Sequence, residues 1–177
     1  MLKLALVLFM VLPFVNNASS KKDVIVWNDA VVLSWSDFKG KAKDKKDHIA
    51  MSRCGIHMEQ SAYSLPHGKP TYSFYAFFVP ESSWYLKDKV TGKTLLHEQL
   101  HFDVAELYAR KLRKIFSDTK VDPASSKTLF DETYKEYRSM QQQYDRETQN
   151  GTNEQAQKRW VLKIRNGLEQ NSKYRID

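Results

Sequence analysis

The chain has 177 residues, with 28 lysines and arginines against 21 aspartates and glutamates, so its formal net charge is +7. Acidic residues are interspersed with the basic ones, and even the densest basic run, residues 39–47, contains aspartates. No nucleic-acid-binding motif accompanies this charge, so we exclude nucleic acid as a partner. Cys54 is the only cysteine, which excludes an intramolecular disulfide and leaves stability to packing.

The first 20 residues have the layout of a secretory signal peptide. Met1-Leu2-Lys3 is a short cationic start, residues 4–15 are almost entirely apolar, and Ala18-Ser19-Ser20 is a small-residue cleavage site. The apolar run holds about a dozen residues, fewer than the roughly 20 that a membrane-spanning helix needs. We therefore predict a secreted or periplasmic protein, in which residues 21–177 form one domain with no membrane span.

The first half of this domain predicts β-strands. Its runs of β-branched and apolar residues, bounded by turn-forming residues, are residues 23–27, 30–35, 49–61 and 71–79. The last run is apolar on both faces and ends at Pro80. Such a pattern predicts a central strand or one that helices cover.

The second half predicts helices. From about residue 91, apolar residues such as Leu96, Leu100 and Val104 follow helical spacing, up to a break at residues 118–126. A second helix is predicted over residues 126–148, and Thr152-Asn153-Glu154-Gln155 predicts a capping box that opens a third. Strands followed by three helices predict an α+β domain, with an antiparallel-rich sheet and the first helix packed on it.

The first predicted helix carries the motif His97-Glu98-Gln99-Leu100-His101. At about 100° per residue, the two histidines lie on one face, one turn apart, and their imidazoles converge. Zinc binds such neutral nitrogens at about 2.0–2.1 Å, together with a third protein ligand and a water molecule. Glu98 is placed to take a proton from that water. The motif therefore predicts a catalytic zinc site.

The spacing of the sequence leaves several candidates for the third zinc ligand. The extended motif, with a glycine at position 104 and a third histidine at position 107, is absent, because these positions are valine and leucine. Glu106 lies about 140° around the helix from His101, so it points elsewhere. The remaining candidates are Asp145, Glu147, Glu132, His57 and His67.

Three blocks of the chain resemble the bacterial family known as domain of unknown function 922. The first block is Trp35-Ser36-Asp37-Phe38-Lys39-Gly40. The second is the histidine motif in its longer form, Leu96 to Asp103 with Glu106, Ala109 and Arg110. The third is Tyr144-Asp145-Arg146-Glu147-Thr148 with Gly151, Gln157 and Trp160. The resemblance implies a secreted protein with a zincin-like fold and the chemistry of a zinc-dependent protease.

One position departs from the family pattern. The third block of the family reads Tyr-Asp-x-x-Thr-x-His-Gly, and Asn150 occupies the place of its histidine. An amide is a poor zinc ligand beside imidazole or carboxylate. We therefore take Asp145 as the third metal ligand, and Tyr144 as a candidate oxyanion donor.

These observations predict a secreted or periplasmic zinc-dependent peptidase. It would hydrolyse peptide bonds of a peptide or protein substrate by metal-activated water, with Glu98 as the general base. Asn150 favours the alternative, a non-catalytic envelope binding or assembly module that retains the zincin-like fold. A hydrolase of non-peptide amides, such as cell-wall linkages, is a third hypothesis. Oligomeric state is not predicted by the sequence.

Overall fold

The structure is a computed structural model that describes residues 23–42, 48–61, 70–119 and 121–176. The predicted signal peptide, residues 1–20, lies outside the described residues. None of the helices in the described part of the chain combines the length and the hydrophobicity needed to cross a lipid bilayer.

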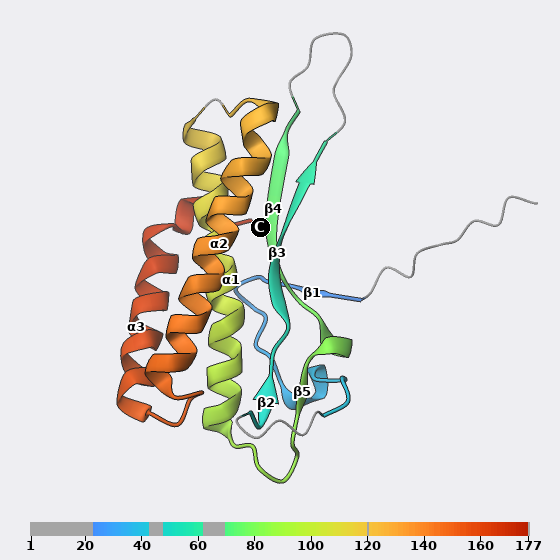
Figure 1. Cartoon of the computed structure of the whole chain (residues 1–177), viewed down its shortest axis with the longest axis vertical. Helices are drawn as coiled ribbons and strands as arrows, with labels where there is room; N and C mark the ends of the chain where they lie inside the picture. The colour runs from blue at the N-terminus through green and yellow to red at the C-terminus, as the bar shows by residue number, and fades with distance from the viewer. Residues whose placement is uncertain (1–22, 43–47, 62–69, 120, 177) are drawn as a thin grey trace, which may run out of the picture.

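A layer of helices covers one face of a small antiparallel sheet (Figure 1). The sheet contains β1 (Ile25–Val26), β3 (Cys54–Gln60) and β4 (Tyr72–Phe78), in the order β1-β4-β3. A second pair of strands joins β2 (Ala50–Met51) to β5 (Trp84–Tyr85), also antiparallel. The predicted α+β class, with strands first and helices afterwards, is confirmed.

β4 is the middle strand of the larger sheet, as its apolar faces predicted. Phe74, Ala76 and Phe78 on one face are buried and contribute to the main hydrophobic core. On the opposite face the ring of Phe77 covers Gly55 of β3, where a Cβ atom would lie 2.7 Å from the ring. Removing this apolar surface from water is the main force that holds the sheet to the helices.

The predicted strand over residues 30–35 is wrong. The chain there forms no strand and enters a short 3-10 helix, η1 (Trp35–Asp37), through a capping box. The Asp37 carboxylate accepts hydrogen bonds from the backbone nitrogen of Ser34 at 2.7 Å and from its hydroxyl at 2.8 Å. Serine and aspartate at this spacing offer the backbone a local partner, which competes with strand pairing.

The predicted strand over residues 49–61 is divided into β2 and β3, which belong to different sheets. Side chains from distant parts of the chain cause the interruption. The backbone nitrogen of Ser52 donates to the Glu98 carboxylate at 2.7 Å, and that of Arg53 donates to the Ser83 hydroxyl at 2.8 Å. Neither of these backbone N–H groups is therefore available for a hydrogen bond between strands.

Three long helices follow: α1 (Gly92–Asp118), α2 (Pro123–Thr148) and α3 (Glu154–Gln170). α2 begins earlier than predicted, because Asp122 caps it and proline is tolerated in the first turn. The cap of α3 is Asn153, whose side chain accepts from the backbone nitrogen of Ala156 at 3.1 Å. The capping box predicted from Thr152 is thus displaced by one residue.

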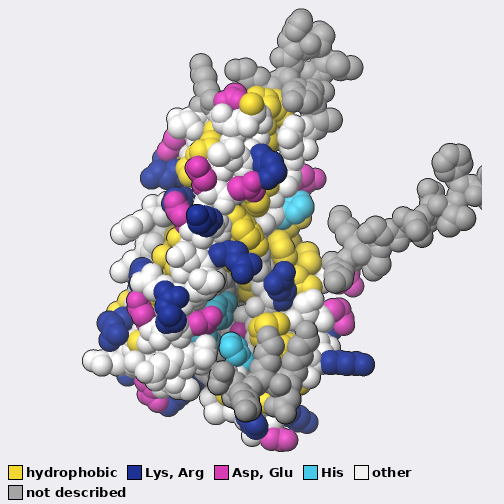
Figure 2. Space-filling model, viewed as in Figure 1, with side chains coloured by type: hydrophobic (Ala, Val, Ile, Leu, Met, Phe, Trp, Pro, Cys, Tyr) yellow, Lys and Arg dark blue, Asp and Glu magenta, His cyan; other side chains and the backbone are white. Residues whose placement is uncertain are grey.

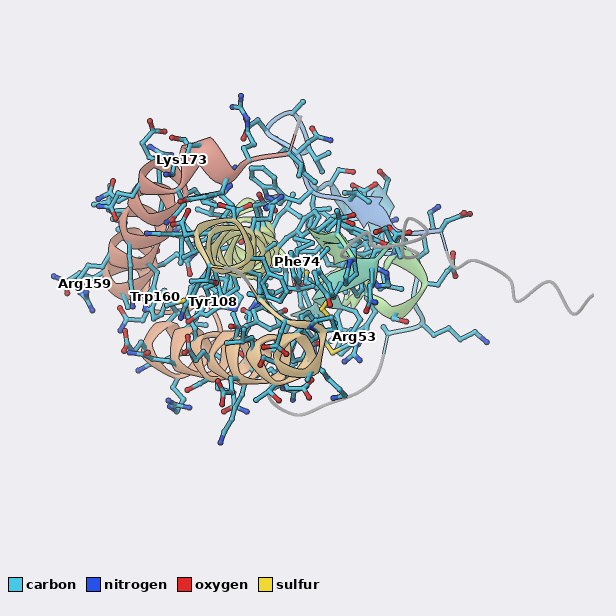
Figure 3. The ribbon with its side chains drawn as sticks, turned by 90° about the horizontal axis from the view of Figure 1, so that it is seen from above. Arg53, Phe74, Tyr108, Arg159, Trp160 and Lys173 are labelled. Carbon is cyan, nitrogen blue, oxygen red and sulfur yellow. The ribbon has the colours of Figure 1, made fainter. Side chains whose placement is uncertain are left out.

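α1 lies in the middle of the molecule, between the sheet, α2 and α3 (Figure 3). The predicted packing of this helix on the sheet is confirmed. Because α1 has neighbours on several sides, some of its polar residues are buried too, among them His97, Glu98, Glu106 and Arg110. Each of these buried polar groups needs a partner within the protein.

Glu106 finds its partners among the arginines of its own helix. Its carboxylate lies 2.9 Å from the Arg110 Nε atom and 2.6 Å from an Arg113 nitrogen. The Arg110 guanidinium also lies over the Trp27 ring, 5.2 Å from its centroid. Burial raises the pKa of Glu106 even though the two arginines oppose this rise. Glu106 thus belongs to a buried ion cluster away from His101, as its position on the helix predicted.

We expect Glu106→Ala to lower the free energy of unfolding by about 3–5 kcal/mol, because it leaves buried guanidinium groups without their counter-charge. Glu136, which pairs with Lys111 at the surface, provides the matched control. Glu136→Ala should cost at most about 1 kcal/mol. Urea denaturation followed by circular dichroism measures both losses. Similar small losses would contradict a structural role for the buried cluster.

Candidate metal centre

His97 and His101 converge on Asp145, where α1 meets the last turns of α2. The Nε2 atoms of the two histidines are 3.2 Å apart. The Asp145 Oδ1 atom lies 3.3 Å from the His97 Nε2 atom and 2.9 Å from the His101 Nε2 atom. In the part of the chain that the structure describes, these residues form the one group of histidine, cysteine and acidic side chains that could hold a metal ion.

The spacing of these three atoms fits a metal ion. Ligands at about 2.0–2.1 Å from a tetrahedral zinc ion lie about 3.3–3.4 Å from one another. The distances in the structure, 2.9 to 3.3 Å, come close to this value without any movement of the backbone. Two imidazoles and one carboxylate suit zinc, and they also suit other divalent first-row metals.

The ligand atoms face a pocket of about 420 Å³, which Glu98 also lines. The His97 and His101 side chains are 4% and 14% exposed, whereas that of Asp145 is 37% exposed. The two histidines on α1 are therefore largely buried, whereas Asp145 on α2 is partly exposed to solvent. Such a site leaves room for a water molecule or a substrate atom beside three protein ligands.

The protonation states of His101 and Asp145 depend on each other. Burial lowers the pKa of His101, but the hydrogen bond to Asp145 and the nearby Glu98 carboxylate outweigh burial and raise it to about 8. Burial raises the pKa of Asp145, yet the bonds to His101 and His97 outweigh it and hold the pKa well below its usual range. Metal binding therefore competes with a proton shared between His101 and Asp145.

His97 is held in place by residues from α2, α3 and the connection between them. Its Nδ1 atom lies 3.2 Å from the Gln157 Oε1 atom, which leaves the Nε2 atom for the metal. The Tyr144 ring stacks on the imidazole at a centroid distance of 4.6 Å. Gly151, with φ of 84°, approaches the ring so closely that a Cβ atom would lie 2.9 Å from His97 Cγ.

His101 has a comparable support on α2. Its Nδ1 atom lies 2.6 Å from the Gln141 Oε1 atom, and the Gln141 Nε2 atom donates to the His101 carbonyl at 2.9 Å. Sequence reasoning missed Gln141. It stands one helical turn before Asp145, on the same face of α2, and this spacing is the signal that could have found it.

Glu98 is oriented by Ser52, a residue that sequence reasoning also missed. The Glu98 Oε2 atom accepts hydrogen bonds from the backbone nitrogen and the hydroxyl of Ser52, both at 2.7 Å. Glu98 is thus fixed through one oxygen beside the metal ligands while it remains outside the ligand group.

Tyr144 does not line the pocket. Its side chain is fully buried, and its hydroxyl donates to the His97 carbonyl at 3.2 Å and accepts from the Gln157 Nε2 atom at 2.7 Å. Burial raises the pKa of this phenol, although the bond to Gln157 opposes the rise. The geometry favours a positioning role for Tyr144, in support of His97, over the predicted role of oxyanion donor.

The other candidates for the third ligand lie elsewhere or have other partners. Glu147 accepts a hydrogen bond from the Trp160 indole at 2.8 Å, and the His57 ring packs on Tyr75 at a centroid distance of 4.9 Å. Glu132 is exposed on α2. His67 lies outside the described residues. Asn150 lines the pocket in a left-handed conformation, with φ of 52°.

A comparison with protein families identifies the central part of the chain. The family model described as "Bacterial protein of unknown function (DUF922)" matches residues 81–152. We call residues 81–152 the DUF922 segment. This match confirms the resemblance predicted from the sequence blocks, and the DUF922 segment contains His97, Glu98, His101 and Asp145. No match was found among curated proteins or among solved structures.

The amino-terminal block, Trp35 to Gly40, lies outside the DUF922 segment but contacts its beginning. The Gly40 nitrogen donates to the Ser83 carbonyl at 2.7 Å, and a Cβ atom on Gly40 would lie 2.8 Å from that oxygen. The Trp35 ring stacks on Tyr85 at a centroid distance of 4.7 Å. Because Ser83 binds the backbone next to Ser52, this block supports the position of Glu98 indirectly.

We expect the purified protein to carry about one metal ion per chain after reconstitution with zinc, because three donors converge on one point. His97→Ala or His101→Ala should abolish stoichiometric binding, whereas His57→Ala on the exposed part of β3 should preserve it. Elemental analysis after gel filtration measures the ratio. A wild-type protein that emerges free of metal contradicts the site.

Asp145→Ala should weaken zinc binding by more than about 100-fold, since even residues that only support a ligand contribute about 10–100-fold. Glu132→Ala, which removes an exposed carboxylate from the same helix, is the matched control. Competition with a chromogenic chelator gives both affinities. Equal affinity of the two variants would show that Asp145 is not the third ligand.

Proposed function

We propose that this protein is a secreted or periplasmic zinc-dependent peptidase with a zincin-like fold. The observation that carries the proposal is the convergence of His97, His101 and Asp145 in one pocket with Glu98. Two histidines and one carboxylate form the ligand set of catalytic zinc sites, which keep a coordination position open for water. The signal-peptide pattern of residues 1–20 supports the proposed location.

A bound zinc ion supplies a water molecule of lowered pKa and polarises the carbonyl group of the substrate. The residues of the chain provide the geometry. Gln157 and Gln141 each engage the Nδ1 atom of one ligand histidine, so both Nε2 atoms are directed to the same point. The Asp145 carboxylate adds a negative charge, which retains a divalent cation.

Glu98 acts as the general base in this proposal. Its carboxylate accepts the proton of the attacking water and then returns the proton to the nitrogen of the leaving amine. Ser52 holds one carboxylate oxygen with two hydrogen bonds, so the orientation of Glu98 does not depend on the substrate. A base held before the substrate binds has less entropy to lose in the reaction.

The position of Asn150 helps to decide between the peptidase and a non-catalytic module. That alternative drew its support from the missing family histidine at this position. In the structure the Asp145 carboxylate already supplies a third possible ligand beside the two histidines. Asn150 nevertheless lines the pocket, where an amide can donate a hydrogen bond to a bound peptide. These observations favour the peptidase over the module.

Glu98→Gln should keep the bound zinc but reduce peptide cleavage by about 10²–10⁴-fold, the usual contribution of a positioned base. Elemental analysis measures the zinc, and a library of fluorescence-quenched peptides measures cleavage. Glu59→Gln, at an exposed position on β3, serves as the control.

Two results would oppose the proposal in different ways. If Glu98→Gln cleaves as fast as wild type, the base is another residue. If the zinc-loaded wild type cleaves no peptide in the library, the non-catalytic module becomes the better explanation of the same metal centre.

A further inference from the structure

Two arginines line the pocket that His97, His101 and Asp145 face. Arg53 comes from the connection between β2 and β3, and Arg138 comes from α2. Both residues are exposed. Figure 2 shows this face of the molecule, where histidine side chains lie close to acidic ones and basic side chains stand nearby. Figure 3 shows Arg53 on the side of the sheet that faces α2.

The acidic residues of the pocket are already engaged. Among the residues that the structure describes, Glu98 and Asp145 are the carboxylates that line it, and they bind Ser52 and the two histidines. Among the described residues, no carboxylate pairs with the guanidinium of Arg53 or Arg138. A divalent ion would balance Glu98 and Asp145, so these two arginines would leave the pocket with an excess of positive charge.

We propose that Arg53 and Arg138 select substrates that carry a carboxylate close to the scissile bond. The inference rests on the proposed peptidase function and specifies its substrate class. A guanidinium binds a carboxylate through two parallel hydrogen bonds, which makes arginine the natural residue for this recognition. A neutral or basic peptide would leave both arginines without a counter-charge.

The positions of the arginines indicate how far the carboxylate lies from the bond that is cleaved. Arg138 precedes Asp145 by two helical turns on the same face of α2, a rise of about 10 Å. An extended peptide covers that distance in about three residues. Arg53 directly follows Ser52, whose backbone nitrogen binds Glu98. The carboxylate is therefore expected within about three residues of the scissile bond.

A carboxylate in this place can come from an acidic side chain or from the end of the substrate chain. Both present the same group to the arginines. A peptide series separates the two sources. Hexapeptides of neutral residues carry glutamate, glutamine or lysine at one fixed position, and each peptide is made with a free and with an amidated carboxyl terminus.

The zinc-loaded wild type should cleave peptides with a carboxylate at least about fivefold faster, in kcat/KM, than the matched neutral peptides. Arg53→Gln and Arg138→Gln should each reduce this preference by about fivefold, and higher salt should reduce it in wild type. Arg159→Gln is the matched control, because Arg159 projects from the outer side of α3, away from the pocket (Figure 3). Its preference should equal that of wild type.

The two carboxylate sources give different patterns within this result. A preference that follows internal glutamate assigns the arginines to an acidic side chain. A preference that disappears on amidation assigns them to the terminal carboxylate. Either pattern supports the inference. Equal rates on charged and neutral peptides, or a preference that survives both arginine substitutions, would overturn it.

Calorimetry with the zinc-loaded Glu98→Gln variant tests the inference without turnover. Peptides with a carboxylate should bind at least about fivefold more tightly than neutral ones, and adding Arg53→Gln or Arg138→Gln should remove this difference. If no peptide is cleaved but this difference is found, the peptidase proposal fails and the carboxylate-binding pocket stands. Equal affinities would overturn the pocket, whatever the result of the cleavage assays.

Discussion

The packing of the three helices depends on the contacts that surround the His97 imidazole. The residue belongs to α1, its ring is stacked by Tyr144 of α2, and its Nδ1 atom is engaged by Gln157 of α3. Gly151, between α2 and α3, has no side chain that would collide with the ring. One imidazole therefore determines how closely all three helices approach. Asp145 follows Tyr144 in the chain, so the same packing brings the third donor to the histidines.

A second series of contacts, from the strands, positions Glu98. Gly40 binds the Ser83 carbonyl, the Ser83 hydroxyl accepts from the Arg53 backbone, and the neighbouring Ser52 donates to the Glu98 carboxylate. These contacts join residues far apart in the sequence. The candidate metal ligands are thus supported by the helices, and the candidate base is supported by the β-rich half. Packing of α1 on the sheet brings the two sets into one pocket.

Features that arise from local spacing could be predicted from the sequence. The two histidines one turn apart, the three helices and the apolar strand over residues 71–79 needed only the periodicity of the chain. Features that depend on distant partners could not be predicted. Nothing near Ser52 shows that its backbone will bind Glu98 and interrupt a strand. Asp145 was one of five candidates, because helix geometry fixes the direction of a side chain but not the neighbour that it meets.

The donor atoms of the metal group are nitrogen and oxygen, and the single cysteine is outside the group. Burial raises the pKa of the Cys54 thiol, although a hydrogen bond with Ser52 opposes the rise, so Cys54 remains protonated at neutral pH and is a weak competitor for the metal. Thiolate ligands are lost when they are oxidised to sulfenic acid or to a disulfide, whereas imidazole and carboxylate have no such weakness. A centre of this composition keeps its full set of donors in an oxidising environment, where a cysteine-based centre would need protection.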